Sequence, residues 1–163
     1  AVMVNLGGSH LERGDIRRAR AIVDEALGIV AGRGDLRAIA RAVLKSGEIF
    51  LAEGNPQRAR ELALEGLGYR LQDEDWRTIV ESCQVLLPAE MALGHAEQAA
   101  LLLGLIRFRV AQAGITRYQG TERLLARMET ETRRVLGNAA AEAAYRAGAG
   151  FTLAELKQQF GAV

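Results

Sequence analysis

A glycine followed five positions later by an alanine recurs every forty residues in this chain. The three copies are Gly14–Ala19 (GDIRRA), Gly54–Ala59 (GNPQRA) and Gly94–Ala99 (GHAEQA). A fixed period of this length is typical of arrays of stacked helical pairs, because one pair alone is too small to bury its apolar face. The period therefore predicts a helical repeat protein, a class that usually binds other proteins.

Neighbouring columns support the same forty-residue register. An apolar residue stands three positions before each glycine: Leu11, Leu51 and Met91. Apolar pairs stand eight and nine positions after it: Ile22-Val23, Leu62-Ala63 and Leu102-Leu103. The third copy diverges further along, as expected for the atypical end of a short array.

Composition indicates one all-α domain over residues 1–163. Of the 163 residues, 49% are hydrophobic and only two are proline, which is enough apolar surface for a continuous core and favours helices. The longest apolar stretch, 99–106, is too short to span a bilayer, and no secretion signal opens the chain. The first residue is not Met, which indicates a piece of a longer protein.

Charge and cysteine content narrow the expected partners and compartment. The 21 basic and 20 acidic residues give a net charge of +1, so we expect neither nucleic acid nor membrane as a partner. The one cysteine, Cys83, excludes an internal disulfide and fits a reducing cytoplasm. Its apolar neighbours favour a buried structural thiol over a nucleophile.

Caps and breakers predict seven or eight helices joined by short connections. Asp15, Asp35, Asn55 and Thr152 are expected N-caps, with Pro56 at a first helical position. Thr116 with Gln119 forms a capping-box pattern before a helix that ends near Leu136. We further expect a kink or break near Val85 to Leu87 because of Pro88, and a helix break at Gly148-Ala149-Gly150.

The turn and the small residue after it resemble those of the tetratricopeptide repeat (TPR) family. The likeness lies in Leu6-Gly7, Gly14-Asp15, Ala19 and Ala26-Leu27, and again in Gly47, Gly54-Asn55, Ala59 and Gly66-Leu67. It implies a right-handed α-α superhelix of about four antiparallel pairs: residues 1–35 (partial), 36–75, 76–115, and a degenerate unit with a capping helix over 116–163. That family repeats at about 34 residues, whereas HEAT and armadillo units lie near forty, so these remain the alternative solenoid.

The last third is similar to the closing region of helical sensor domains in bacterial signal-transduction ATPases of the STAND class and in LuxR-type regulators. The strings AALLLG, EAAYRAG and FTLAE carry this likeness. It implies a domain that receives an inducer or partner protein, with the ATPase and any DNA-binding domain outside this chain.

The residues give no sign of an enzyme. His10 and His95 are expected at helix ends, and no His, Cys and carboxylate cluster has metal-ligand spacing. The glycines at 32, 34, 148 and 150 lack the Lys-Ser/Thr of a phosphate loop. We therefore expect no catalytic residues, no metal and no cofactor.

Two surfaces are candidate partner sites. In TPR-type arrays the first helix of each pair lines the concave face, which here would present Arg41, Leu44, Lys45, Glu48, Glu81 and Gln84 to a protein or peptide. The bland alternative is a solvated polar face. The second candidate is a basic ridge of Arg123, Arg127 and Arg134 on one helix, for which ordinary surface solubility is the alternative.

The functional hypothesis is a non-catalytic protein-interaction or ligand-sensing module of a larger bacterial signalling or transcriptional regulator, whose partner is a protein, a peptide or a small-molecule inducer. The alternative is a scaffold that homo-oligomerises through the array ends, as a homodimer in the simplest case. A nucleic-acid-binding solenoid is the third class, and balanced charge disfavours it.

Overall fold

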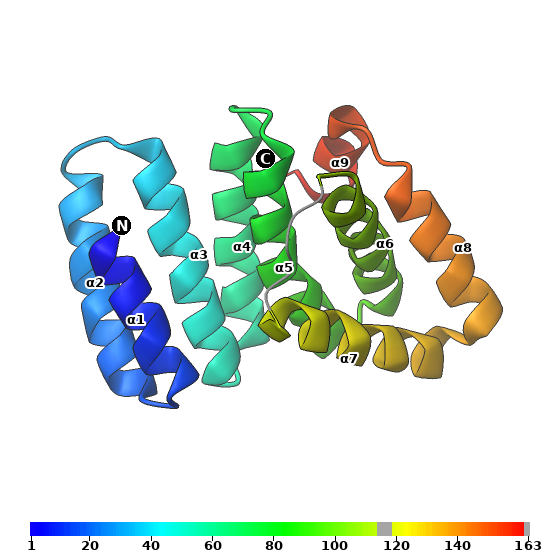
Figure 1. The fold of residues 1–163 in the computed structure, drawn as a ribbon, viewed down its shortest axis with the longest axis horizontal. Helices are drawn as coiled ribbons and strands as arrows, with labels where there is room; N and C mark the ends of the chain where they lie inside the picture. The colour runs from blue at the N-terminus through cyan, green and yellow to red at the C-terminus, as the bar shows by residue number, and fades with distance from the viewer. Residues whose placement is uncertain (114–118, 162–163) are drawn as a thin grey trace.

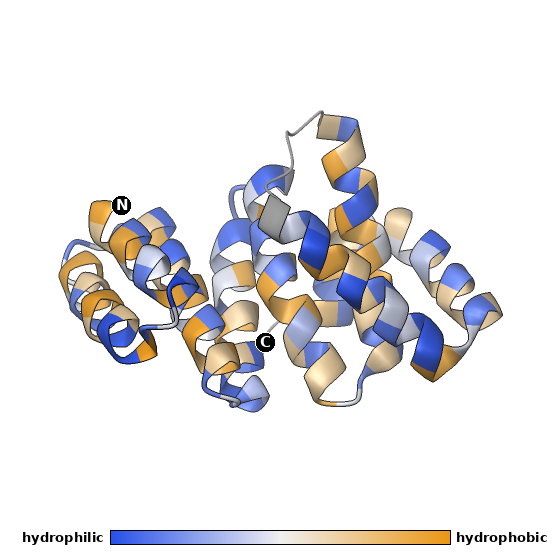
Figure 2. Ribbon diagram, turned by 60° about the horizontal axis from the view of Figure 1, so that its bottom comes forward, coloured by the Kyte–Doolittle hydropathy of each residue, from blue (hydrophilic) through white to orange (hydrophobic). Residues whose placement is uncertain are grey.

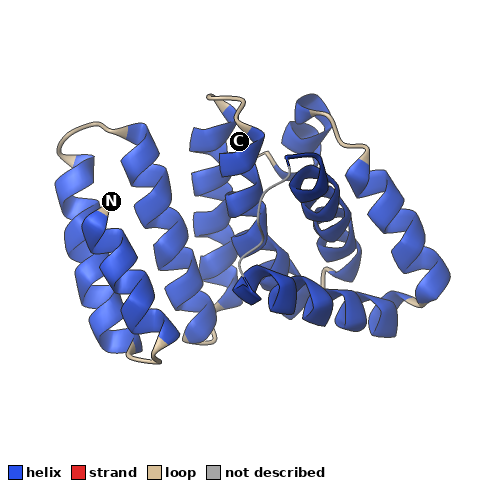
Figure 3. Cartoon of the chain, viewed as in Figure 1, coloured by secondary structure: helices blue, strands red, loops and turns tan. Residues whose placement is uncertain are grey.

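The computed structural model describes residues 1–113 and 119–161, and within these it contains nine α-helices. The six of the first three pairs are α1 (Val2–Glu12), α2 (Ile16–Ala31), α3 (Leu36–Ala52), α4 (Pro56–Leu71), α5 (Trp76–Ala92) and α6 (Ala96–Ala113). The rest are α7 (Gln119–Leu136), α8 (Asn138–Ala149) and α9 (Leu153–Phe160). Short loops join successive helices from α1 to α6 and from α7 to α9 (Figure 3).

The helices of the first three pairs repeat at forty residues along the chain. Helices α4 and α5 begin and end forty residues after α2 and α3, and α6 begins forty after α4. From α1 to α6, each helix packs antiparallel against the next, and first helices pack side by side, α1 on α3 and α3 on α5 (Figure 1). This sequential packing is consistent with the predicted helical repeat array, and Figure 2 shows hydrophilic and hydrophobic residues together on these helices.

The three glycines occupy the same backbone position in three equivalent reversals. Gly14, Gly54 and Gly94 have φ of +79°, +76° and +83°, a region that only glycine enters at no steric cost. The preceding C-cap residues share one conformation, with φ near −82° and ψ near −1°. Each alanine that follows, at 19, 59 and 99, is 0% exposed. The small side chain lets the paired helices approach closely.

The second reversal in each unit also repeats, but one copy uses an unfavourable residue. Gly34 has φ of +66°, and Glu74, forty residues later, has φ of +53°. Both precede an aspartate that caps the next helix through its side chain, Asp35 for α3 and Asp75 for α5. A glutamate in this region is strained by about 1–2 kcal/mol.

The core is one large apolar cluster around α4, α5 and α6, with smaller clusters between α1, α2 and α3. Leu86, Leu87, Leu102, Leu103, Leu105 and Ile106 are fully buried within the large cluster. Helix α6 is apolar nearly all round because α5, α7 and α8 cover it. Leu156 and Phe160 of α9 join the same cluster, and α9 returns to α4.

The last pair departs from the regular arrangement. Helix α7 lies crosswise to α5 and α6 at one end of the array (Figure 1), and α8 packs chiefly on α6. The α6–α8 contact depends on two glycines, because a Cβ on Gly104 would meet the backbone of Tyr145 and a Cβ on Gly148 would meet that of Leu101. Gly148 therefore lies inside α8, and the break predicted at residues 148–150 comes only at Gly150.

Two further expectations are corrected. Of the kink or break predicted near Val85 to Leu87, the break is wrong, because Pro88 lies inside α5, which continues without interruption; the kink stays a prediction. Packing of α5 between α4 and α6 offsets the lost backbone hydrogen bond. The described part of the chain contains nine helices, above the seven or eight expected. The predicted capping box at Thr116 lies outside the described residues.

Gly148→Ala should lower the free energy of unfolding by at least about 1–3 kcal/mol, because its Cβ overpacks against backbone that cannot move aside. Gly28→Ala is the matched control, since a Cβ there meets nothing within 4 Å. The same added methyl group, at this exposed position of α2, should raise the free energy of unfolding by about 0.5–1 kcal/mol. Urea unfolding followed by circular dichroism measures both, and equal effects would contradict the close α6–α8 crossing.

Glu74→Gly should raise the free energy of unfolding by up to about 1 kcal/mol, because glycine relieves the left-handed conformation at some entropic cost. The control is Gln72→Gly, at a right-handed φ of −72°, where glycine can only add freedom to the unfolded chain. Thermal melts of the two variants check this; stabilisation of both or of neither would refute the strain at Glu74.

Candidate binding site

A pocket of about 540 Å³ opens where the first turns of α3 and α5 meet the end of α4. Its wall combines four arginines with four carboxylates: Arg37, Arg41, Arg70, Arg77, Asp35, Asp73, Asp75 and Glu81. We call it the polar pocket. Both helices begin beside the pocket, and each carries a capping aspartate there, Asp35 on α3 and Asp75 on α5.

Every carboxylate in the polar pocket already accepts a hydrogen bond from the protein. Asp35 accepts from the N–H of Ala38 at 3.1 Å, and Asp75 from the N–H of Arg77 at 3.0 Å. Asp73 accepts from Arg37 Nε at 2.9 Å, a contact that raises the pKa of the Arg37 guanidinium. Glu81 accepts from Arg70 Nη1 at 2.6 Å.

Arg70 forms the floor of the polar pocket. Arg70 is only 7% exposed. Its Nη1 donates both to Glu81 and to the backbone carbonyl of Thr78. A buried guanidinium needs such partners, since an unpaired buried charge is very costly. Tyr69 lies beside it in the wall, and burial raises the pKa of the Tyr69 phenol, with the nearby Glu65 carboxylate adding to the effect.

Two arginines of the polar pocket have no such side-chain partner in the described chain. Within the described chain, no hydrogen bond or ion pair joins the side chain of Arg41 or of Arg77 to another residue. Both residues are exposed. A guanidinium group without a protein partner is able to bind a carboxylate or phosphate in a bidentate manner.

The structure brings together part of the predicted concave-face set. Arg41 and Glu81, predicted to stand in matching columns, both line the polar pocket. Lys45 and Glu48 form an ion pair at 2.5 Å, and the Lys45 side chain lies over Gly8 of α1, away from that pocket. Gln84 is half-buried. Leu44 is 4% exposed and packs against Gly66, so its prediction as a surface contact is corrected: it belongs to the core.

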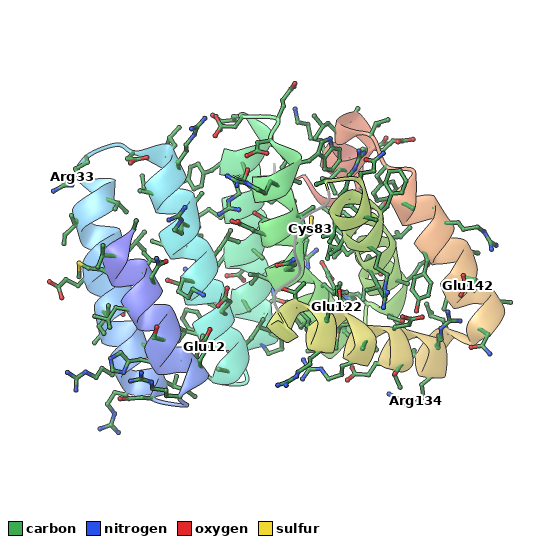
Figure 4. All side chains as sticks on the ribbon, in the orientation of Figure 1. Glu12, Arg33, Cys83, Glu122, Arg134 and Glu142 are labelled. Carbon is green, nitrogen blue, oxygen red and sulfur yellow. The ribbon has the colours of Figure 1, made fainter. Side chains whose placement is uncertain are left out.

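The predicted basic ridge lies on α7. Arg123, Arg127 and Arg134 are all exposed there, and Figure 4 shows Arg134 pointing away from the helices at the outer edge. Arg127 lies 4.0 Å from Glu131, which is a weak surface pair. The polar pocket, which lies among α3, α4 and α5, does not include this ridge.

Sequence reasoning missed Arg70, Arg77 and Tyr69. The signal was present in the forty-residue register, because Arg70 occupies the column of Val30 and Tyr69 that of Ile29. A charged residue in a column that is apolar in the neighbouring unit indicates either a local partner or a site. For Arg70, the register alone could not tell which.

A second buried polar cluster stabilises the hairpin at Gly94. Glu90 is fully buried and accepts from Arg60 Nε at 2.8 Å, while His95 Nδ1 lies 2.5 Å from its other oxygen. Forty residues earlier, Arg20 lies 4.2 Å from the ring centre of Phe50, in the column of Glu90. The arginine thus recurs and pairs with a carboxylate in both units, Glu53 for Arg20 and Glu90 for Arg60, while the residue in the column of Glu90 is an aromatic ring in the earlier unit. His95 lies at the helix end as predicted.

Cys83 and Trp76 have structural roles. Cys83 is buried among the helices (Figure 4), and burial raises the pKa of its thiol to about 12, which disfavours the nucleophilic thiolate. Trp76 is half-buried under Arg109, whose guanidinium carbon lies 3.7 Å from the ring centre and whose Nη2 donates to the carbonyl of Phe151. Trp76 therefore ties α5 to α6 and to the start of α9.

Comparisons with known proteins identify no family. No protein-family model, no curated protein and no solved structure matches this chain. Within the described residues, no group of His, Cys, Asp and Glu is placed to hold a metal ion. None of the helices in that part of the chain is long and apolar enough to cross a membrane.

Proposed function

We propose that this chain is a non-catalytic protein-interaction module, a TPR-like superhelical array that binds its partner at the polar pocket. The observation that carries the proposal is a pocket of about 540 Å³ whose wall holds two arginines, Arg41 and Arg77, with no protein partner in the described chain. Its carboxylates accept hydrogen bonds as helix caps or in ion pairs. Such an arrangement favours recognition of a ligand over acid–base chemistry, for which a carboxylate must be able to take up or release a proton.

The proposal extends to a sensing role in a larger bacterial regulator. The sequence of the last third supports this through its likeness to sensor domains of STAND-class ATPases and LuxR-type regulators. In such a protein the array would favour one state of an attached effector by binding its ligand better in that state. A P-loop module or a helix-turn-helix encoded in the same reading frame would support the extension.

Arg41→Glu should abolish capture of the partner, because it replaces an uncommitted cation of the pocket with an anion. The test immobilises the wild-type chain and two variants, incubates each with lysate of the source organism, and compares the retained proteins by mass spectrometry. The control is Arg146→Glu, the same change on the exposed face of α8. Circular dichroism confirms that both variants are folded.

The expected result is a protein retained by the wild type and by Arg146→Glu and lost with Arg41→Glu. Equal retention by all three would remove the polar pocket as the binding site.

A further inference from the structure

A second pocket, of about 530 Å³, occupies the equivalent place one unit earlier. It opens between the start of α1, the end of α2 and the start of α3. Adding forty to its lining residues gives eight that also line the polar pocket: 41, 69, 70, 73, 75, 77, 78 and 81. The repeat therefore builds the same pocket twice, at two successive junctions between units.

The two pockets differ in chemistry because the repeat columns differ in sequence. Ile29 stands where the polar pocket has Tyr69, Val30 where it has Arg70, and Ala1 where it has Arg41. We call the pocket between α1, α2 and α3 the apolar pocket. Ile29 is 42% exposed and Val2, also in its wall, is 81% exposed, so apolar side chains face solvent there.

The start of α3 forms the partition between the pockets. Asp35, Arg37 and Arg41 line both, so a ligand lying over this helix end would enter the two pockets at once. Helices that pack directly, as α1 does on α3 and α3 on α5, have axes about 8–10 Å apart. An extended peptide covers that distance in about three residues, at about 3.3–3.6 Å each.

The start of α3 forms part of the wall of the polar pocket without filling it. Residues 34 to 37 and Ala40 line the pocket, and its volume stays open beside them. Leu36 in this turn is 47% exposed, which adds an apolar edge next to the arginines. The same helix end thus offers both kinds of contact.

We propose that one extended peptide segment of a partner protein occupies both pockets, with an aliphatic or aromatic side chain in the apolar pocket and an Asp or Glu side chain at Arg41 and Arg77. The two side chains are about three residues apart. This specificity rests on the proposed interaction function and adds to it the chemistry of the ligand. Charge complementarity sets the acidic position, because the carboxylates of the polar pocket already accept hydrogen bonds from the protein and these two guanidinium groups donate none within the described chain.

The test is selection from a phage-displayed library of random twelve-residue peptides on the immobilised chain, followed by fluorescence anisotropy with the selected peptide. Enriched peptides should share an apolar residue and an acidic residue with one to three residues between them. Arg41→Gln should weaken binding at least about tenfold, as expected for loss of a charge-assisted hydrogen bond. Ile29→Glu should weaken peptide binding to a similar extent. Arg146→Gln, at an exposed position of α8, should leave peptide binding unchanged.

Three results would overturn this inference. The interaction function itself is tested separately, by the lysate experiment. Enriched peptides without an acidic residue, or with binding unaffected by Arg41→Gln, would show that the arginines do not select the ligand. No enriched peptide, together with a partner captured from lysate, would show that a folded surface binds instead. Self-association in sedimentation velocity that Ile29→Glu abolishes would assign the apolar pocket to a second copy of this chain.

Discussion

The arrangement of this protein depends on how each first helix reverses into its partner. At Gly14, Gly54 and Gly94 the chain takes a left-handed conformation with φ between +76° and +83°, and one turn into the next helix a fully buried alanine lets the two backbones approach. These two requirements fix the orientation of the second helix on the first. Because they recur every forty residues, the pairs stack in one register, and each new pair covers the apolar face of the previous one.

A common register gives every position a counterpart in the next unit, and the protein varies chemistry at these counterparts while the backbone stays the same. Gly34 becomes Glu74 at the second reversal, with a positive φ in both. Phe50 becomes Glu90, and each contacts the arginine of one repeat column, Arg20 or Arg60. Val30 becomes Arg70, which converts the floor of an apolar pocket into a polar one. The candidate site is therefore a product of sequence divergence on repeated geometry.

Much of the fold could be predicted from the sequence, because short-range chemistry determines it. Asp15, Asp35, Asn55 and Thr152 cap the helices that the sequence assigns to them. Long-range contacts were the source of the errors. Gly148 was taken as a helix breaker, and only its crossing with α6 explains a glycine inside α8. Leu44 was assigned to a surface, because the sequence does not show that Gly66 leaves space for it.

The candidate site was predictable only in part. The matching columns of Arg41 and Glu81 followed from the period, but the roles of Arg70 and Arg77 depend on which carboxylates are already paired. Pairing is a property of three helices meeting at one place, and a single sequence contains no record of it.

Removal of one complete repeat tests the shared register most directly. Deleting residues 16–55 joins Asp15 to Pro56 and places α4 after α1 across an equivalent turn. Deleting residues 16–57 instead starts α4 two residues later and turns its apolar face by about 200°. If the pairs stack in one register, the first deletion retains helical circular dichroism and a single cooperative thermal transition, and the second loses the transition. Loss of cooperative unfolding in both, or its retention in both, would contradict the account.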